Sequence, residues 1–300
     1  MMSEMGLKKA SIEGSFWDFI AKLVEKIGAL IFTIILARFL LPEGFGAYSL
    51  TMSVALVFIG FISYSVDGTM IRFVSEALGK KNKKMATIYF KYLFKKKILF
   101  TFIASVFLLI SAYPLSIYVF KKPFLFPLLF ISGFYIFVLA IENTYESLFY
   151  VFKRLKGRTI KEVFKQSLRI FITILIFFLI AKSYYVVGVL VGLILTNIAV
   201  LIFVLLYVRR VAFFLFDKKQ KEKLDKKRVI KFLYYLLVGG VAGAIFSYVD
   251  ILMLGVLLPD TKYIGFYSAA VTLIWGLAGL LSFNSVFLPI FAQVQKKRLE

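Results

Sequence analysis

The stretch Leu40-Leu41-Pro42-Glu43-Gly44-Phe45-Gly46-Ala47-Tyr48-Ser49 joins two long apolar segments, and a similar stretch returns late in this chain. The second copy is Leu257-Leu258-Pro259-Asp260-Thr261-Lys262-Tyr263-Ile264-Gly265-Phe266-Tyr267-Ser268. Leu-Leu-Pro-acid aligns at an offset of 217 residues and Gly-x-Tyr-Ser at 219, because the second copy is two residues longer. Proline ends the incoming helix, glycine permits a tight turn, and the next helix begins at Tyr-Ser. The self-match predicts that a helical hairpin has been duplicated.

The composition indicates a membrane protein. Of the 300 residues, 61% are hydrophobic, and the mean hydropathy is +0.89, more apolar than a water-soluble domain requires. The chain has no Cys, which excludes disulfides and thiol chemistry, and no His, which removes the commonest metal ligand and proton shuttle. We therefore predict neither a metal site nor a cofactor.

Eight segments are long and apolar enough to cross a bilayer as helices, so we expect an all-α integral membrane protein. They are residues 17–41, 47–66, 98–120, 124–152, 164–181, 184–208, 232–258 and 263–292. Asp67-Gly68 is expected to end the second span, and Thr69–Leu78 to form a short amphipathic surface helix. In the fifth span, Lys165 and Arg169 are expected to snorkel to the headgroups.

The basic residues predict the orientation of these spans. If the N-terminus is inside, 31 of the 38 Lys and Arg residues fall on inner segments, five on outer segments, and Lys22 and Lys26 within the first span. Because positive loops stay in the cytoplasm, we predict cytoplasmic N- and C-termini. The net charge of +22 then reflects topology and affinity for anionic membrane lipids, not nucleic-acid binding.

Both copies of the hairpin begin on the inside, which predicts a parallel repeat about an axis normal to the membrane. We expect a six-helix N-terminal lobe at residues 1–208, a charged cytoplasmic linker at 209–229, and the first two helices of a C-terminal lobe at 230–300. Secondary transporters are often built from such repeated halves. Compared with the first unit, the second lacks four spans, so we expect the sequence to be cut short after the eighth span.

Two stretches of the sequence resemble a known protein family. Ala37-Arg38-Phe39 followed by Leu40–Tyr48 resembles the polysaccharide-biosynthesis flippases of the multidrug/oligosaccharidyl-lipid/polysaccharide exporter superfamily. Val249–Gly255, followed by Ile264–Ala270, is similar to that family's seventh span and the turn after it. The similarity extends from about Phe16 to Gln293.

The resemblance implies a transporter and not an enzyme. Such exporters have roughly twelve to fourteen spans in two six-helix lobes, and alternating access moves lipid-linked oligosaccharides across the cell membrane. Because this sequence stops after the eighth predicted span, we expect either a fragment or a chain that needs a partner. That partner would be the missing C-terminal lobe or polysaccharide-assembly proteins.

Ionisable residues inside the spans are the candidate site residues, because burying them is costly. Asp250 lies in an otherwise uncharged span. It is either a cavity acid for a coupling cation or substrate, or a carboxylate paired with a base such as Arg38. Lys22, Glu25 and Lys26 share one helical face. The two lysines either attract a phosphate headgroup or snorkel at the inner interface.

Further candidates lie on later spans. Glu142 and Glu146 share a face of the fourth span, where they either bind a cation or pair with cytoplasmic-end lysines. Asn197 and Asn284 either bind sugar hydroxyls or form interhelical hydrogen bonds. No phosphate-binding glycine loop or catalytic triad is present in the sequence. We predict substrate contacts at Lys22, Lys26, Asp250 and Asn284, and possible ion coupling at Glu25, Glu142 and Asp250.

Three alternatives remain open. A cation-coupled multidrug exporter of the same superfamily needs an acid deep in the first lobe, and Glu25 lies near the inner surface. A membrane-embedded sugar transferase usually holds a metal with paired acids on loops, but the first outer loop offers only Glu43. The third alternative is an inactive fragment.

Overall fold

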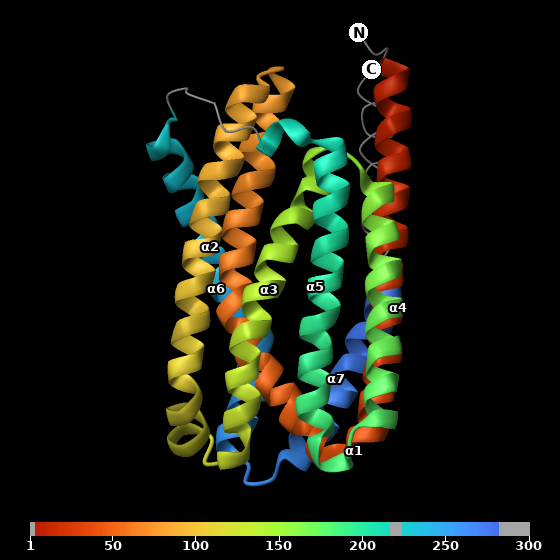
Figure 1. The fold of residues 1–300 in the computed structure, drawn as a ribbon, viewed down its shortest axis with the longest axis vertical. Coiled ribbons are helices and arrows are strands. Elements are labelled where there is room, and N and C mark those ends of the chain that lie inside the picture. The colour runs from red at the N-terminus through yellow and green to blue at the C-terminus, as the bar shows by residue number, and fades with distance from the viewer. Residues whose placement is uncertain (1–3, 217–223, 282–300) are drawn as a thin grey trace, which may run out of the picture.

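The computed structural model describes residues 4–216 and 224–281, which form helices and short turns without any strand (Figure 1). Short 3-10 or π segments lie in several of the connections. The α-helices are α1 Glu4–Gly79, α2 Lys83–Pro114, α3 Phe126–Val151, α4 Leu155–Leu179, α5 Tyr185–Val211, α6 Lys226–Leu257 and α7 Thr261–Leu281. The prediction of an all-helical chain is therefore confirmed for the described residues.

Helix α1 contains the first two predicted spans, separated by a kink at Leu41 (φ 58°, ψ 170°). A proline disfavours helical geometry at the residue before it, so Pro42 explains why the break falls at Leu41. The predicted use of glycine in this turn is wrong. No described glycine has a positive φ, and Leu41 itself adopts the left-handed value. Gly44 and Gly46 are therefore not needed for the backbone angles of the turn.

The predicted break at Asp67-Gly68 is also absent. Helix α1 continues through both residues to Gly79, so Thr69–Leu78 is its last part and not a separate surface helix. Asp67 faces the interior, where its carboxylate accepts hydrogen bonds from Lys97 and Thr144. Those tertiary partners satisfy a side chain that would otherwise favour a turn.

The chain is a multi-pass membrane protein. Among the described residues, four helical segments are long and apolar enough to cross a membrane by length and composition. They are Lys83–Val119, Pro123–Val151, Lys182–Val211 and Lys226–Leu257. The two limbs of α1, together with α4 and α7, occupy the positions of the other predicted spans. The total of eight spans stays a prediction.

The connections gather at two ends of the molecule (Figure 1). We call the end with residues 41–46, 120–125, 180–184 and 258–260 the hairpin end, and the opposite end, with residues 79–82, 152–154 and 212–216, the basic end. The Lys and Arg residues of the predicted inner loops flank the turns of the basic end. Which end faces the cytoplasm is a prediction from these charges.

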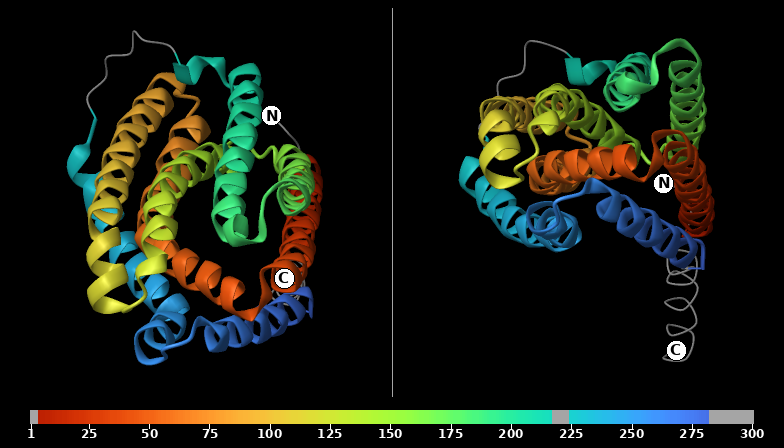
Figure 2. Two further views of the ribbon diagram at one scale, coloured as in Figure 1. Left: turned by 60° about the horizontal axis from the view of Figure 1, so that its bottom comes forward. Right: turned by 90° about the horizontal axis from the view of Figure 1, so that it is seen from below.

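Helices α6 and α7, which we call the C-terminal hairpin, pack along α1 (Figure 2). At the hairpin end the two repeated stretches touch. A Cβ atom at Gly46 would overlap the carbonyl oxygen of Thr261, and one at Gly265 would overlap the carbonyl oxygen of Pro42. At the offset of 219 residues, Gly265 is the counterpart of Gly46 and Thr261 that of Pro42. The two close approaches are thus equivalent under exchange of the repeats.

Two polar contacts tie α6 to α1–α5, which we call the N-terminal bundle. At the hairpin end, the buried Lys122 ammonium donates to the carbonyl oxygens of Gly255 and Leu258, both at 2.8 Å. A cation at this position also suits the negative end of the α6 dipole. At the basic end, Arg228 of α6 forms a two-pronged ion pair with Glu76 of α1, at 3.2 and 2.9 Å. Both ends of α6 are therefore held against the bundle.

Candidate functional site

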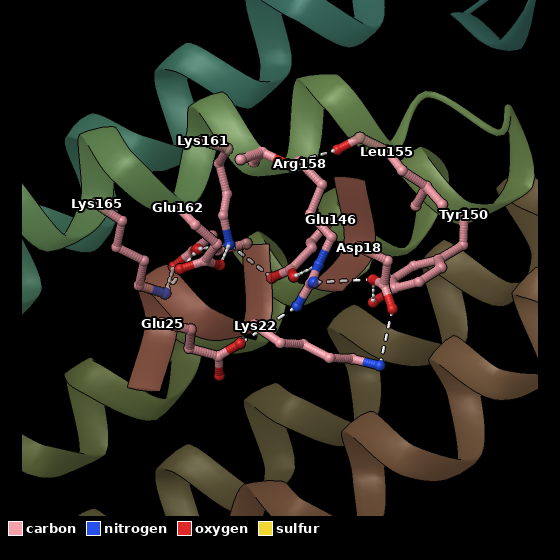
Figure 3. A network of polar contacts seen from close by, with 12 residues as sticks. Asp18, Lys22, Glu25, Glu146, Tyr150, Leu155, Arg158, Lys161, Glu162 and Lys165 are labelled. Atoms are coloured by element: carbon pink, nitrogen blue, oxygen red, sulfur yellow. Dashed lines mark hydrogen bonds and ion pairs between the residues drawn. The ribbon is translucent and has the colours of Figure 1, made fainter. Parts of the chain in front are cut away.

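A network of charged side chains lies between α1, α3 and α4, toward the basic end (Figure 3). Helical periodicity explains how it forms. Glu142, Glu146 and Tyr150 recur every four residues and share one face of α3. Arg158, Lys161 and Lys165 share the facing stripe of α4. The members are Asp18, Lys22, Glu25, Glu142, Glu146, Tyr150, Arg158, Lys161, Glu162 and Lys165.

The core of the network is buried, with only a small exposed fraction at Glu146 and Lys165. The Lys161 ammonium lies 2.7 Å from a Glu146 oxygen, 2.5 Å from Glu162 and 3.4 Å from Glu142. Lys165 contacts both oxygens of Glu142, at 2.7 and 2.9 Å. The side chains of Lys161 and Glu142 have no exposed surface. Because an unpaired charge in such a place would be costly, each partner requires the others.

Arg158 connects this core to α1. Its Nε lies 2.9 Å from Glu146, its Nη1 3.0 Å from Asp18, and its Nη2 3.3 Å from Glu25. The Tyr150 hydroxyl also donates to Asp18, at 3.0 Å. One guanidinium thus joins three carboxylates from two helices. This arrangement uses the planar fork of donors that arginine provides.

The most exposed members of the network, among the described residues, lie on α1. Lys22 lies 2.8 Å from Asp18 and keeps 44% of its side chain exposed, and Glu25 keeps 51%. Lys26, one turn after Lys22, is half-buried and forms no ion pair with a described residue. The open edge therefore offers two ammonium groups and one carboxylate to a ligand.

The structure brings together three of the predicted site residues, Lys22, Glu25 and Glu142, through Arg158, Glu146 and Lys161. For Glu142 and Glu146, the interpretation as carboxylates paired with lysines is confirmed. These residues carry no free carboxylate for a cation. Asn284 lies outside the described residues.

Asp250 lies apart from the network, on α6. The Tyr267 hydroxyl of α7 donates to its Oδ2 at 2.5 Å, and the Ile251 amide donates to its Oδ1 at 2.8 Å. Arg38, suggested as its partner, forms no ion pair with a described residue, so that pairing is wrong. Among the described residues, Asp250 is a membrane-embedded carboxylate without a cationic partner.

The prediction that Lys165 and Arg169 snorkel to the headgroups is wrong. Lys165 turns inward to Glu142, and Arg169 lies over the Phe32 ring, 4.2 Å from its centroid. The Arg169 Nη2 donates to Gln166, while its buried Nε has no hydrogen-bond partner. The cation–π contact of Arg169 and the inward ion pair of Lys165 replace the expected exposure to lipid headgroups.

Sequence reasoning missed a second buried ion pair. Lys97 of α2, fully buried, lies 2.7 Å from Asp67 of α1 and 3.0 Å from the Ser63 hydroxyl. Thr144 of α3 donates to the other Asp67 oxygen at 3.0 Å. In the sequence, Lys97 directly precedes the span predicted at residues 98–120, where a lysine is expected at the membrane surface. The one available signal was an acid at the end of an uncharged span, one helix away from a lysine at the start of the next.

Metal binding finds no support in the described ranges, where no three His, Cys, Asp or Glu side chains are grouped to hold an ion. The network consists of carboxylates paired with ammonium and guanidinium groups, so the interactions within it are electrostatic. It can present and withdraw charges inside a membrane, where such groups usually mark a pathway for polar solutes.

The fold is similar to those of solved structures described as MATE or MOP superfamily transporters. The MATE multidrug transporter DinF-BH, in complex with R6G, is similar with a TM-score of 0.68 and 17% identity, covering 97% of this chain and 66% of that one. A MOP superfamily transporter from Pyrococcus furiosus, described as having a binding pocket of reversed polarity, gives 0.65 and 15%, covering 93% and 66%. An inward-facing multidrug resistance MATE family transporter gives 0.61 and 13%, covering 88% and 59%.

The sequence comparison identifies a protein family, which the comparison of folds does not. Residues 11–295 match the profile of the polysaccharide biosynthesis protein family, and the chain belongs to that family. Comparison with curated proteins gives no match. The chain spans about two thirds, 66%, of the length of the first two solved transporters.

Proposed function

We propose that this protein moves lipid-linked saccharides from the cytoplasmic to the outer leaflet of the cell membrane. Membership of the polysaccharide biosynthesis protein family supports the saccharide, and likeness to MOP superfamily transporters supports translocation. The single observation that carries the proposal is the asymmetry between the two ends. Hairpins touch at one end, while charged groups of the network are exposed on α1 nearer the other.

The geometry suggests how a headgroup is received. With the basic end in the cytoplasm, Lys22 and Lys26 stand where a diphosphate would enter from the inner leaflet. Each lysine is a flexible point charge and suits phosphate oxygens. Glu25 and Asp18 hold the network together when no substrate is bound, because they already neutralise Arg158 and Lys22. A diphosphate would compete with those carboxylates.

Release on the other side requires the hairpin end to open. The contacts between Gly46 and Gly265 and the hydrogen bonds of Lys122 must then separate. This is the rocking of one repeat against the other that repeated transporters use. Glu142 is already paired with two lysines, which makes it a poor site for a coupling cation. Asp250 is the stronger candidate, with Tyr267 as its switchable partner.

The test is translocation in vesicles. The purified chain would be reconstituted with a fluorescent lipid-linked oligosaccharide, and movement between leaflets followed by quenching from outside. We expect the protein to move the lipid-linked oligosaccharide between leaflets. Lys26→Gln should slow this movement, whereas Lys121→Gln, at the hairpin end, should leave it unchanged. Vesicles with the protein that flip no faster than empty vesicles, even with a co-expressed partner lobe, would refute the proposal.

Cation-coupled drug export is the second candidate, because the fold resembles that of a MATE multidrug transporter in complex with R6G. The same vesicles distinguish the two. Uptake of R6G that stops when the ion gradient is collapsed, with no movement of lipid-linked saccharide, would favour drug export. Partnership with a further lobe or with polysaccharide-assembly proteins is part of our proposal and is tested by the co-expression.

A further inference from the structure

A hollow lies at the hairpin end, away from the charge network. Its volume is about 550 Å³, within the roughly 300–1,000 Å³ of ligand pockets. The N-terminal bundle and the C-terminal hairpin both line it. We call it the hairpin pocket and define it by Glu43, Phe124, Ser183, Tyr184, Asp260 and Thr261.

The acids of the pocket come from the duplication. Glu43 and Asp260 follow the two repeated prolines, at the offset of 217 residues, and the hairpin contact brings them to one cavity. Between them, the Thr261 hydroxyl donates to the Glu43 carbonyl oxygen at 3.0 Å. Asp260 is half-exposed and lies 3.4 Å from Lys262. Both carboxylates can accept hydrogen bonds from a ligand.

The remaining wall combines aromatic rings with hydroxyl groups. Phe124 and Tyr184 are 54% and 62% exposed, and their rings suit a flat apolar ligand face. Ser183 and Tyr184 add hydroxyl groups that both donate and accept. Helices α3 and α5 begin beside the pocket without side-chain caps, so their dipoles add a positive contribution.

This combination matches a saccharide. Sugar hydroxyls donate to carboxylates and exchange hydrogen bonds with protein hydroxyls, while the C–H face of a sugar ring packs on an aromatic ring. The negative charges of two carboxylates in one pocket repel an anionic ligand. A purely apolar ligand would make no use of the hydrogen-bonding capacity of these two acids.

We propose that the hairpin pocket binds the neutral, hydroxyl-bearing part of a saccharide. Only the source of that saccharide, a lipid-linked or a free chain, rests on the proposed function. Because the pocket exists only while the hairpins touch, a bound saccharide stabilises this closed arrangement. A translocated saccharide on the outer face would then oppose reopening of the hairpin end.

The experiment measures binding, not transport, so it can fail separately from the proposed function. The full chain in lipid nanodiscs is titrated with the neutral trisaccharides maltotriose and tri-N-acetylglucosamine, with trigalacturonate, and with inorganic phosphate. Saturation-transfer NMR and calorimetry give the affinities. We expect a neutral trisaccharide to bind more tightly than trigalacturonate, and phosphate not to compete.

Variants locate the site. Tyr184→Ala and the double change Glu43→Gln with Asp260→Asn should each weaken binding about tenfold, the effect of one lost stacking or charged hydrogen-bond contact. Tyr118→Ala is the matched control, because Tyr118 is similarly exposed but does not line the pocket. No binding of either neutral trisaccharide, equal loss in the control, or phosphate competition would overturn the proposal. Tighter binding of a lipid-linked than a free saccharide would identify the translocated substrate as the source.

Discussion

Replacing Gly46 by alanine should open the hairpin end. A Cβ atom at this position would overlap the Thr261 carbonyl oxygen and lie 2.7 Å from the carbonyl carbon and 2.9 Å from the Gly265 nitrogen. All three are backbone atoms, which cannot rotate away as a side chain can. The two hairpins must therefore separate or α1 must shift. The change acts on the contact between repeats and leaves the charge network intact.

The magnitude follows from overpacking. Inserting one methyl group into a tight contact typically costs about 1–3 kcal/mol. If the closed arrangement alone bears this penalty, the ratio of closed to open molecules falls about 5- to 150-fold. Gly265→Ala should act similarly, since its Cβ would meet Pro42 and Gly46 in the same way. The double variant should fall short of the sum, because both changes strain one contact.

The assay uses the absence of native cysteine. Spin labels at Arg38→Cys and Lys262→Cys report the separation of the two hairpins by electron–electron distance measurement. We expect one short distance in the parent and a longer population in Gly46→Ala. Gly79→Ala is the control, because a Cβ there would meet no atom within 4 Å. Equal distance distributions in the parent and Gly46→Ala, with equal thermal stability, would refute the reasoning.

Three further predictions concern the charged groups. Lys161→Met should lower the free energy of unfolding by about 3–5 kcal/mol, because it leaves buried carboxylates unpaired. Lys22→Met, at the exposed edge, should lower it by less than about 1 kcal/mol. Thermal denaturation in nanodiscs measures both variants, and equal losses would contradict the buried network. Lys122→Met should lengthen the distance between the spin labels at positions 38 and 262, and Lys122→Gln should lengthen it less. Unchanged distances in both variants would show that the hydrogen bonds from Lys122 to the carbonyl oxygens do not hold α6 in place. Hydrogen bonds from Lys80 and Arg228 hold the pKa of Glu76 below its usual 4.5. The contact between Glu76 and Arg228 therefore stabilises the protein above pH about 4.5, and this stabilisation is lost as the pH falls further. Spin labels on α1 and α6 at the basic end should separate on acidification, and Glu76→Gln should abolish that response.

Much of the fold followed from local rules. Pro42 predicted the break between the first two spans, and the kink at Leu41 confirmed it. The repeated Leu-Leu-Pro-acid and Gly-x-Tyr-Ser patterns predicted two related hairpins, which touch at equivalent positions. These signals are local because proline lacks the backbone N–H that the interior of a helix requires. The pairing of Glu142 and Glu146 with lysines was also predictable, from acids and bases on adjacent spans.

The partners of individual charges were not predictable to the same degree. Lys97 and Arg169 each stand next to the end of an apolar run, where a basic side chain is expected to contact lipid headgroups. Their burial depends on which helix stands opposite, and no periodicity within one span encodes that. Asp67 shows the same limit. Its Asp-Gly pair reads as a helix end, but Lys97 and Thr144 satisfy the carboxylate inside a continuous helix.

By itself the sequence determined a polytopic helical membrane protein with a duplicated hairpin and basic residues gathered toward alternate turns. Hydrophobicity, proline and charge act within a few residues of their own position, so a single chain displays them. Tertiary structure alone decided that Arg158 joins three carboxylates, that Asp250 meets Tyr267, and that two repeated acids share one pocket. Those contacts depend on the packing of whole helices, whose relative rotation and depth are set by many side chains at once.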